Sequence, residues 1–397
     1  MKRIPMVILS ITIILTTCIG CENKVNNDDS THQENTLEQF DPKLNAVYEA
    51  IEDNRYEDAY SLLQTVEGHE SLELNNKFAY ILLSEEFSNS NTKNTTVYVY
   101  DEKGYLIREV DPNSNDEYER LYSYDEKGNL LSEKSHTTEY IYTYDDAGHV
   151  LTETKYNNST EQHNYSYTYD KNGNMLTKTF SSPRQYMEFR YMYNKNNVLV
   201  SMEEWENHQK NGTEVYTYDK KGNMTSSTYV FDTDKWKEEK FTYDNDGNIL
   251  EHKLLYYSGI GKTRSYTYNK QGKVVTKNEI QHDGDWNKII CTYDNKGNCL
   301  TKEETSSGGS YNTYTYTYDK NGRIITKEFY GQYNDDRQNT VYTYDDKNKQ
   351  VISKHSYGSG DIETQTYTWK IMYYPNGIPE NVPILPSNDD IINIQID

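Results

Sequence analysis

The most regular pattern along the chain is Tyr alternating with Thr or Ser, followed by Tyr-Asp, a short polar stretch and then aliphatic residues. "YTYDKNGNMLTK" at 167–178 is one copy, and close variants begin at Tyr216 and Tyr316. Alternation with a period of two predicts a β-strand with one aromatic face. The aliphatic run after the polar stretch predicts a second strand. Each copy is therefore expected to form a β-hairpin.

The hairpin pattern recurs at a nearly constant period. The Tyr that precedes Asp or Asn returns at steps of 20 to 26 residues, most often 25, in eleven copies. These residues are Tyr100, Tyr124, Tyr144, Tyr169, Tyr193, Tyr218, Tyr243, Tyr268, Tyr293, Tyr318 and Tyr344. Such a period predicts a repeat array. We expect a mainly all-β fold over residues 96–377, an antiparallel hairpin meander of about 22 strands that twists into a curved or spiral strip. The Tyr-rich face and the face with Thr and Leu are both candidates for the buried side.

One position of each copy carries the turn. The residue after the Tyr is Asp or Asn, whose side chain bonds backbone two residues further on in a type I turn. Three residues after it stands Gly in nine copies and Asn in two, the residues that best tolerate positive φ. A type I turn followed by a left-handed residue is the three-residue hairpin loop with a bulge. The predicted turn-forming positions are Gly104, Gly128, Gly148, Gly173, Asn197, Gly222, Gly247, Gly272, Gly297, Gly322 and Asn348.

The first 36 residues differ from the array. Residues 1–20 carry Lys2 and Arg3 and then an apolar run, which leads into "TCIGC" at 17–21. This stretch resembles the lipobox of bacterial lipoproteins, with Cys18 where Leu is usual. The resemblance implies cleavage after residue 20, lipidation of Cys21 and an exported protein anchored to the outer face of the bacterial cell membrane. A plain signal peptide and a short membrane anchor are the alternatives. Residues 21–36 are polar and are expected to form a disordered tether.

Residues 37–90 carry the only helical spacing. Apolar residues recur at three- and four-residue steps in 44–63, and a third run over 74–82 is also expected to be helical. "YEDAYSLL" resembles one tetratricopeptide hairpin, which alone cannot bury its own face. This segment is therefore expected to be a helical cap on the array. Residues 378–397 contain three Pro and are expected to be extended or disordered.

The repeated "YTYDxxGN" resembles the YD repeat of the rearrangement-hotspot (RHS) family over residues 96–377. In that family, hairpins join into a spiralling strip that can close into a hollow shell. The family's Gly-Arg-Leu has one similar counterpart, Gly322-Arg323-Ile324, and its self-cleaving core motif has none. With eleven copies, the resemblance implies a shorter open strip rather than an enclosing toxin shell.

Composition limits the chemistry that the chain can perform. Only 34% of the residues are hydrophobic and 41 are Tyr, so apolar burial must come largely from Tyr rings. The net charge of −22 disfavours nucleic acid and anionic lipid surfaces. No His has a metal-ligand partner at three or four residues, and no nucleophile or phosphate-loop motif is present. We expect no catalytic residue, no metal and no cofactor.

Two sets of residues remain as candidates for special roles. Cys291 and Cys299 are predicted to lie diagonally on one face of a hairpin, and export would permit a disulfide, although diagonal pairs are usually too far apart. Both states of the pair stay open. The four Trp lie outside the repeated Tyr positions, where exposed aromatic rings beside carboxylates are typical of carbohydrate-binding surfaces. They are Trp205, Trp236, Trp286 and Trp369. The same composition is expected of a Tyr-rich core.

These features favour a membrane-anchored, surface-exposed and non-enzymatic binding or scaffold protein. Cell-wall glycan or a surface protein is the candidate partner. The alternative, suggested by the family resemblance, is an accessory or immunity lipoprotein of a contact-dependent toxin system.

Overall fold

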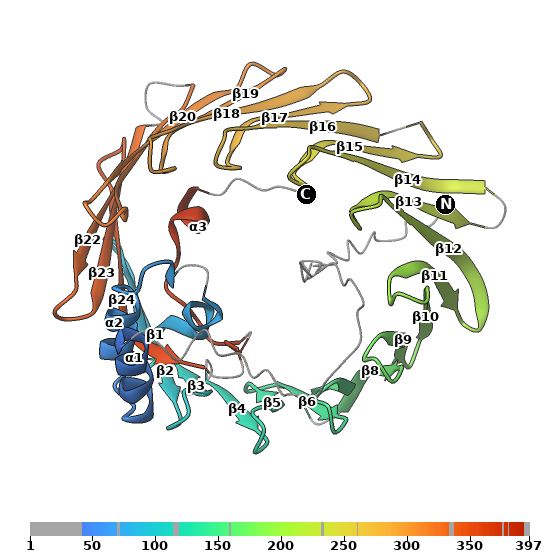
Figure 1. Ribbon diagram of the computed structural model, residues 1–397, viewed down its shortest axis with the longest axis horizontal. Coiled ribbons are helices and arrows are strands. Elements are labelled where there is room, and N and C mark those ends of the chain that lie inside the picture. Colours follow the sequence, from blue (N-terminus) through green and yellow to red (C-terminus); the bar gives the residue numbers. More distant parts are fainter. Residues whose placement is uncertain are drawn as a thin grey trace, which may run out of the picture.

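The chain forms a single antiparallel sheet of 24 strands that closes on itself as a ring (Figure 1). The computed structural model describes residues 42–69, 72–113, 119–158, 160–231, 234–259, 261–332, 337–374, 377–379 and 381–392. Strands that follow one another in sequence pair in the sheet throughout, as a meander requires. The predicted all-β hairpin meander with a small helical segment is confirmed. Residues 1–20 and the tether, including Cys21, lie outside the described residues.

The bounds of the elements follow chain order. The helices are α1 (Pro42–Glu52), α2 (Tyr56–Leu63), the 3₁₀ helix η2 (Glu73–Lys77) and α3 (Asn388–Ile392). The first twelve strands are β1 (Phe78–Ser88), β2 (Lys93–Tyr100), β3 (Leu106–Val110), β4 (Arg120–Tyr124), β5 (Leu130–Lys134), β6 (Thr138–Tyr144), β7 (Val150–Asn157), β8 (Thr160–Tyr169), β9 (Met175–Ser182), β10 (Gln185–Tyr193), β11 (Leu199–Glu206) and β12 (Gln209–Tyr218). The others are β13 (Met224–Phe231), β14 (Asp234–Tyr243), β15 (Ile249–Tyr256), β16 (Gly261–Tyr268), β17 (Val274–Gln281), β18 (Trp286–Tyr293), β19 (Cys299–Ser306), β20 (Tyr311–Tyr318), β21 (Ile324–Tyr330), β22 (Arg337–Asp345), β23 (Gln350–Tyr357) and β24 (Ile362–Tyr373).

The ring is closed by β1, which corrects two expectations. Residues 78–88 form a strand rather than a third helix, and this strand pairs with β24 from Phe78 opposite Tyr373 to Ser88 opposite Thr364. The sheet is therefore closed and not an open strip. The run "FAYILL" lacks two-residue alternation because both faces of the strand are covered, with Ala79 and Ile81 buried as well as Phe78 and Leu82. A short apolar run of this kind is ambiguous between helix and strand.

Helices α1 and α2 cover the start of β1. Leu44, Val47 and Leu63 from the helices form one buried cluster with Phe78 and Trp369. The helical cap was therefore placed correctly over residues 42–63, and it sits beside the seam where β1 meets β24 (Figure 1). A single helical hairpin gains its burial from the sheet in this arrangement.

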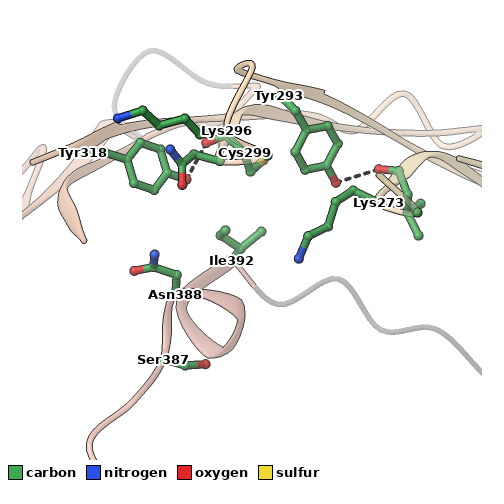
Figure 2. A pocket seen from close by; sticks show the side chains of 12 residues that line it. Lys273, Tyr293, Lys296, Cys299, Tyr318, Ser387, Asn388 and Ile392 are labelled. Carbon is green, nitrogen blue, oxygen red and sulfur yellow. Dashed lines mark hydrogen bonds between the residues drawn. The ribbon is translucent and has the colours of Figure 1, made fainter. Parts of the chain in front are cut away.

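Closure decides which face of the sheet is inside. The Tyr-rich face points into the ring, where α3 packs: Ile392 shares a buried cluster with Tyr316 and Ile324 (Figures 1 and 2). The opposite face carries Thr residues and exposed aliphatic side chains such as Leu176 and Leu250. Threonines that face each other across a hairpin share a hydrogen bond on this outer face, with oxygen–oxygen distances of 2.6–2.8 Å. These pairs are Thr143–Thr152, Thr168–Thr177, Thr267–Thr276, Thr292–Thr301 and Thr317–Thr326.

The described part of the C-terminal tail differs from the expected extended or disordered segment. Ile384 forms a β-bridge with Ile81 on the free side of β1, and residues 388–392 form helix α3. The amide of Asn381 donates to the Tyr124 hydroxyl at 2.6 Å. The three Pro do prevent a continuous strand or helix, but the inner face of the ring supplies partners that the tail sequence does not reveal.

Candidate functional site

The repeated turn is held by one carboxylate. In the copy at 169–175, the backbone N–H groups of Asn172 and Asn174 both donate to Asp170 Oδ1, at 2.8 and 2.9 Å. The Asn174 side chain donates to the other carboxylate oxygen at 2.9 Å. This second contact explains why Asn so often follows the turn Gly. The hydrogen bond from Asn174 also stabilises the charged form of Asp170 and thereby lowers its pKa. The repeated Asp is therefore fully occupied within its own loop.

The backbone at the predicted turn positions is left-handed in ten of the eleven copies. The φ values are 88° at Gly104, 92° at Gly128, 91° at Gly148, 82° at Gly173, 60° at Asn197, 92° at Gly222, 88° at Gly247, 74° at Gly272, 85° at Gly297 and 81° at Gly322. The exception is Asn348, because the left-handed residue of that loop is Lys349, with φ 53°. In this hairpin Tyr344 pairs with Val351 without a bulge, whereas Tyr318 pairs with Ile324 across a bulge, so this loop is one residue longer. The left-handed position therefore falls on Lys349, which also contacts Glu57 at 3.1 Å and the Trp369 ring.

A hydroxyl latch that the sequence analysis missed joins successive hairpins. In nine of the eleven copies the Tyr before Asp or Asn donates its hydroxyl to a backbone carbonyl at 2.5–2.9 Å. The acceptor is the first residue of the second strand of the preceding hairpin, or Leu82 in β1 for Tyr100. The donors are Tyr100, Tyr124, Tyr144, Tyr169, Tyr243, Tyr268, Tyr293, Tyr318 and Tyr344. Figure 2 shows the latch from Tyr293. The signal in the sequence is that Phe never replaces Tyr at this position.

Aromatic side chains gather on the outer face near the edge where successive hairpins are linked. We call Trp205, Trp286 and Tyr311 the aromatic band; they lie on β11, β18 and β20. Alternation along each strand places them on the same side as the outer threonines. Tyr311 is 46% exposed and Trp286 is 40% exposed, so these rings can contact a partner directly. Trp236 on β14 is 54% exposed, but it lies at a register shift between β13 and β14 and its ring contacts Phe231.

Polar groups lie beside the rings of the band. Trp286 is opposite Ile280, which is 52% exposed, and together they form an apolar row across β17 and β18. The next outer row, roughly 7 Å along the strands, contains Asn278 opposite Lys288. Lys288 in turn faces Thr305, which faces Tyr311. The outer face therefore presents flat apolar surface next to amide, ammonium and hydroxyl groups.

The remaining Trp residues have other environments. Trp205 is half-buried, with the Arg190 guanidinium 4.3 Å from its ring and its N–H donating to Glu203 at 3.2 Å. Trp369 is only 7% exposed and belongs to the core under α1 and α2. The suggestion that all four Trp could serve an exposed surface is therefore wrong for Trp369.

The inner face holds a buried charged group whose role is structural. Glu239 accepts from His252 Nε2 at 2.8 Å and pairs with Lys237. Burial opposes ionisation of Glu239, but these partners outweigh it and lower its pKa to about 2. His252 also stacks on Phe241 at 4.4 Å, so this network is satisfied internally. Within the described ranges no group of three or more His, Cys, Asp or Glu is placed to hold a metal ion.

Cys291 and Cys299 lie together on the inner face. Both are 2% exposed and present as thiols, in the cluster that contains Ile392. Cys299 is opposite Tyr293, and Cys291 is opposite Lys302.

Among the helices that the structure describes, none is long and apolar enough to cross a bilayer.

Comparison with known proteins finds solved structures that are similar to the chain at low identity and low TM-score. No protein-family model and no curated protein matches the sequence. The TcdB2–TccC3 structure shares 13% identity with a TM-score of 0.33, covering 74% of this chain and 17% of that one. The Tc holotoxin pore of Photorhabdus luminescens shares 15% identity with a TM-score of 0.34, covering 76% of this chain and 18% of that one. A porin-like protein from Bacteroides uniformis shares 13% identity with a TM-score of 0.25, covering 59% of this chain and 95% of that one. The chain thus spans less than a fifth of the two toxin structures.

Proposed function

We propose that this protein is a lipid-anchored, non-enzymatic surface protein that binds a neutral polysaccharide of the cell wall through its aromatic band. The single observation that carries the proposal is the exposure of Trp286 and Tyr311 on the outer face of the sheet. Exposed aromatic rings are usually avoided on a soluble surface unless they meet a partner.

The chemistry of the band favours a polysaccharide over other partners. The apolar row of Ile280 and Trp286 offers a flat surface for the face of a sugar ring, and Asn278, Lys288 and Thr305 offer hydrogen bonds to its hydroxyl groups. A ligand site of this type combines apolar contact with a few placed polar groups. The net charge of −22 works against anionic polymers, so the neutral glycan backbone is the partner of choice.

The rigidity of the ring supports this role. The meander is closed by the β1–β24 seam and its hairpins are joined by tyrosine latches, so the rings of the band are held on strands of one continuous sheet. Preorganised aromatic groups lose little conformational entropy when they bind.

The experiment measures retention of the purified full chain on insoluble peptidoglycan from which anionic polymers have been removed. Trp286→Ala and Tyr311→Ala are each expected to weaken binding by about tenfold, the effect of losing roughly 1.4 kcal/mol at an aromatic hot spot. The matched control is Leu176→Ala, an outward and 37% exposed side chain away from the band, which should bind as the wild type does. Wild-type retention that is unchanged by both band substitutions would refute the proposal, as would an absence of wild-type retention.

The anchor is tested separately. Cys21→Ser is expected to move the protein from the membrane fraction to the soluble fraction or to leave it unprocessed, whereas Cys18→Ser should stay anchored. A Cys21→Ser protein that is processed and anchored normally would disprove lipidation without affecting the glycan test.

A further inference from the structure

The two buried cysteines form a chemically active pair. Cys291 on β18 and Cys299 on β19 share the inner face of one hairpin, and a hydrogen bond from Cys299 lowers the pKa of Cys291 against the opposing effect of burial. The ammonium group of the neighbouring Lys302 lowers it further. A thiol that ionises more easily attacks a disulfide sulfur more readily at neutral pH, which suits Cys291 to the second of two exchange steps, the attack on a mixed disulfide formed at its neighbour Cys299. Buried structural cysteines in apolar surroundings show the opposite shift.

Helix α3 covers this pair from the centre of the ring. Ile392 packs on both cysteines and is itself only 7% exposed, and it points at the sheet in Figure 2. Lys302 Nζ donates to the Ile392 carbonyl, and Lys327 Nζ donates to the Ile391 carbonyl, each at 3.1 Å. The last carbonyls of a helix are favourable partners for ammonium groups.

Asn388 fixes the other end of α3. Its side-chain amide donates to the Gly322 carbonyl at 2.8 Å, and its side-chain oxygen accepts from the Ile324 N–H at 3.3 Å. Among the described residues, four hydrogen bonds and the side chains of Ile391 and Ile392 hold the helix, whereas the strands beneath it are held by continuous ladders. A segment with so few contacts opens more easily than the sheet does.

A cleft between α3 and the sheet gives access to one of the two sulfurs. It has a volume of about 690 Å³ and is lined by Cys299, Lys273, Ser387 and Asn388 among others, whereas Cys291 does not line it (Figure 2). A small disulfide that enters the cleft therefore meets Cys299 first.

We propose that Cys291 and Cys299 are a redox-active pair whose oxidation by small external disulfides is controlled by the docking of α3. The Cys299 thiolate attacks the external disulfide, which forms a mixed disulfide and releases one thiolate. The Cys291 thiolate then attacks the Cys299 sulfur, which forms the Cys291–Cys299 bond and releases the second thiolate. Two electrons pass from the protein to the external disulfide, and the two protein protons end on the two released thiols.

The experiment follows the full chain in oxidised glutathione. Samples are quenched with acid and alkylated, and the state of Cys291 and Cys299 is read by peptide mass spectrometry, which separates them from the cysteines of the N-terminal segment. Ile392→Asp places a charge in the buried contact, and Asn388→Ala removes the two side-chain hydrogen bonds of Asn388. Both variants should therefore form the internal disulfide at least tenfold faster than the wild type. The control is Ile384→Asp in the same tail, where the side chain is 53% exposed and the rate should stay unchanged.

A further variant tests the order of the two steps. Cys291→Ser should stop at a stable mixed disulfide on Cys299, because the resolving thiolate is missing. Equal oxidation rates in the wild type and both α3 variants would overturn control by the helix. Mixed disulfides that persist on wild-type Cys299 would overturn the redox pair. Neither result depends on polysaccharide binding.

Discussion

Replacing a latch tyrosine with Phe isolates one hydrogen bond of the repeat. Tyr268 donates its hydroxyl to the Ile249 carbonyl at 2.8 Å, and Tyr169 donates to the Val150 carbonyl at 2.9 Å. Phe keeps the ring and its packing and removes only the donor. A hydrogen bond of this type contributes about 0.5–1.5 kcal/mol net, and more if the carbonyl is left buried without a partner. We therefore expect Tyr268→Phe and Tyr169→Phe each to lower the free energy of unfolding by about 1 kcal/mol.

The two latches lie four repeats apart and share no partner, so their effects should add to about 2 kcal/mol in the double variant. Guanidinium unfolding followed by circular dichroism measures both quantities. Tyr257→Phe is the matched control, because that side chain is 69% exposed, and it should change stability by less than about 0.5 kcal/mol. If the latch variants lose no more than Tyr257→Phe does, the hydroxyl contacts do not join the hairpins and the requirement for Tyr needs another cause.

Two further predictions concern the turns and the phenols. Gly222 has φ 92° and open space where a Cβ would lie, so Gly222→Ala should cost about 1–2 kcal/mol of unfolding free energy from backbone strain alone, and Gly222→Asn should cost less; equal losses in guanidinium melts would contradict a left-handed requirement. Burial raises the pKa of Tyr124 and Tyr344 to about 12, against about 10 in an unfolded chain. The stability that these neutral phenols contribute is complete below pH ~10 and is lost as the pH rises from ~10 through ~12. The guanidinium midpoint of unfolding is measured at pH 8, 10, 11 and 12 together with the tyrosinate absorbance, and it should fall only above pH 10. A midpoint that stays constant up to pH 12 would disprove the linkage.

Much of the hairpin could be read from the sequence because its determinants lie within one repeat. The alternation of Tyr with Thr, the Asp that caps the turn and the small residue at the left-handed position act over a dozen residues. Lys349 marks the limit of this local reading: the loop of its hairpin is one residue longer than the others and lacks their bulge, so the positive φ falls on Lys349. Sequence preference alone favours Asn348.

The candidate site was less predictable for the same reason. Four Trp were candidates for a binding surface, and only pairing across strands separates the exposed Trp236 and Trp286 from the buried Trp369. The latch was missed because its acceptor is a backbone carbonyl of the neighbouring repeat, and a carbonyl leaves no trace in a sequence. The closeness of Cys291 and Cys299 was left open because a bulge sets the register of their hairpin.

The sequence by itself determined a repeated β-hairpin with an aromatic face, since steric and hydrogen-bonding preferences act between near neighbours. The tertiary structure alone decided that the strip closes into a ring, that the Tyr face points inward and that the tail folds back over two cysteines. Those outcomes depend on which apolar surfaces remain uncovered once the hairpins have formed. The run at 78–82 can bury both of its faces only between β24, the helices and the tail.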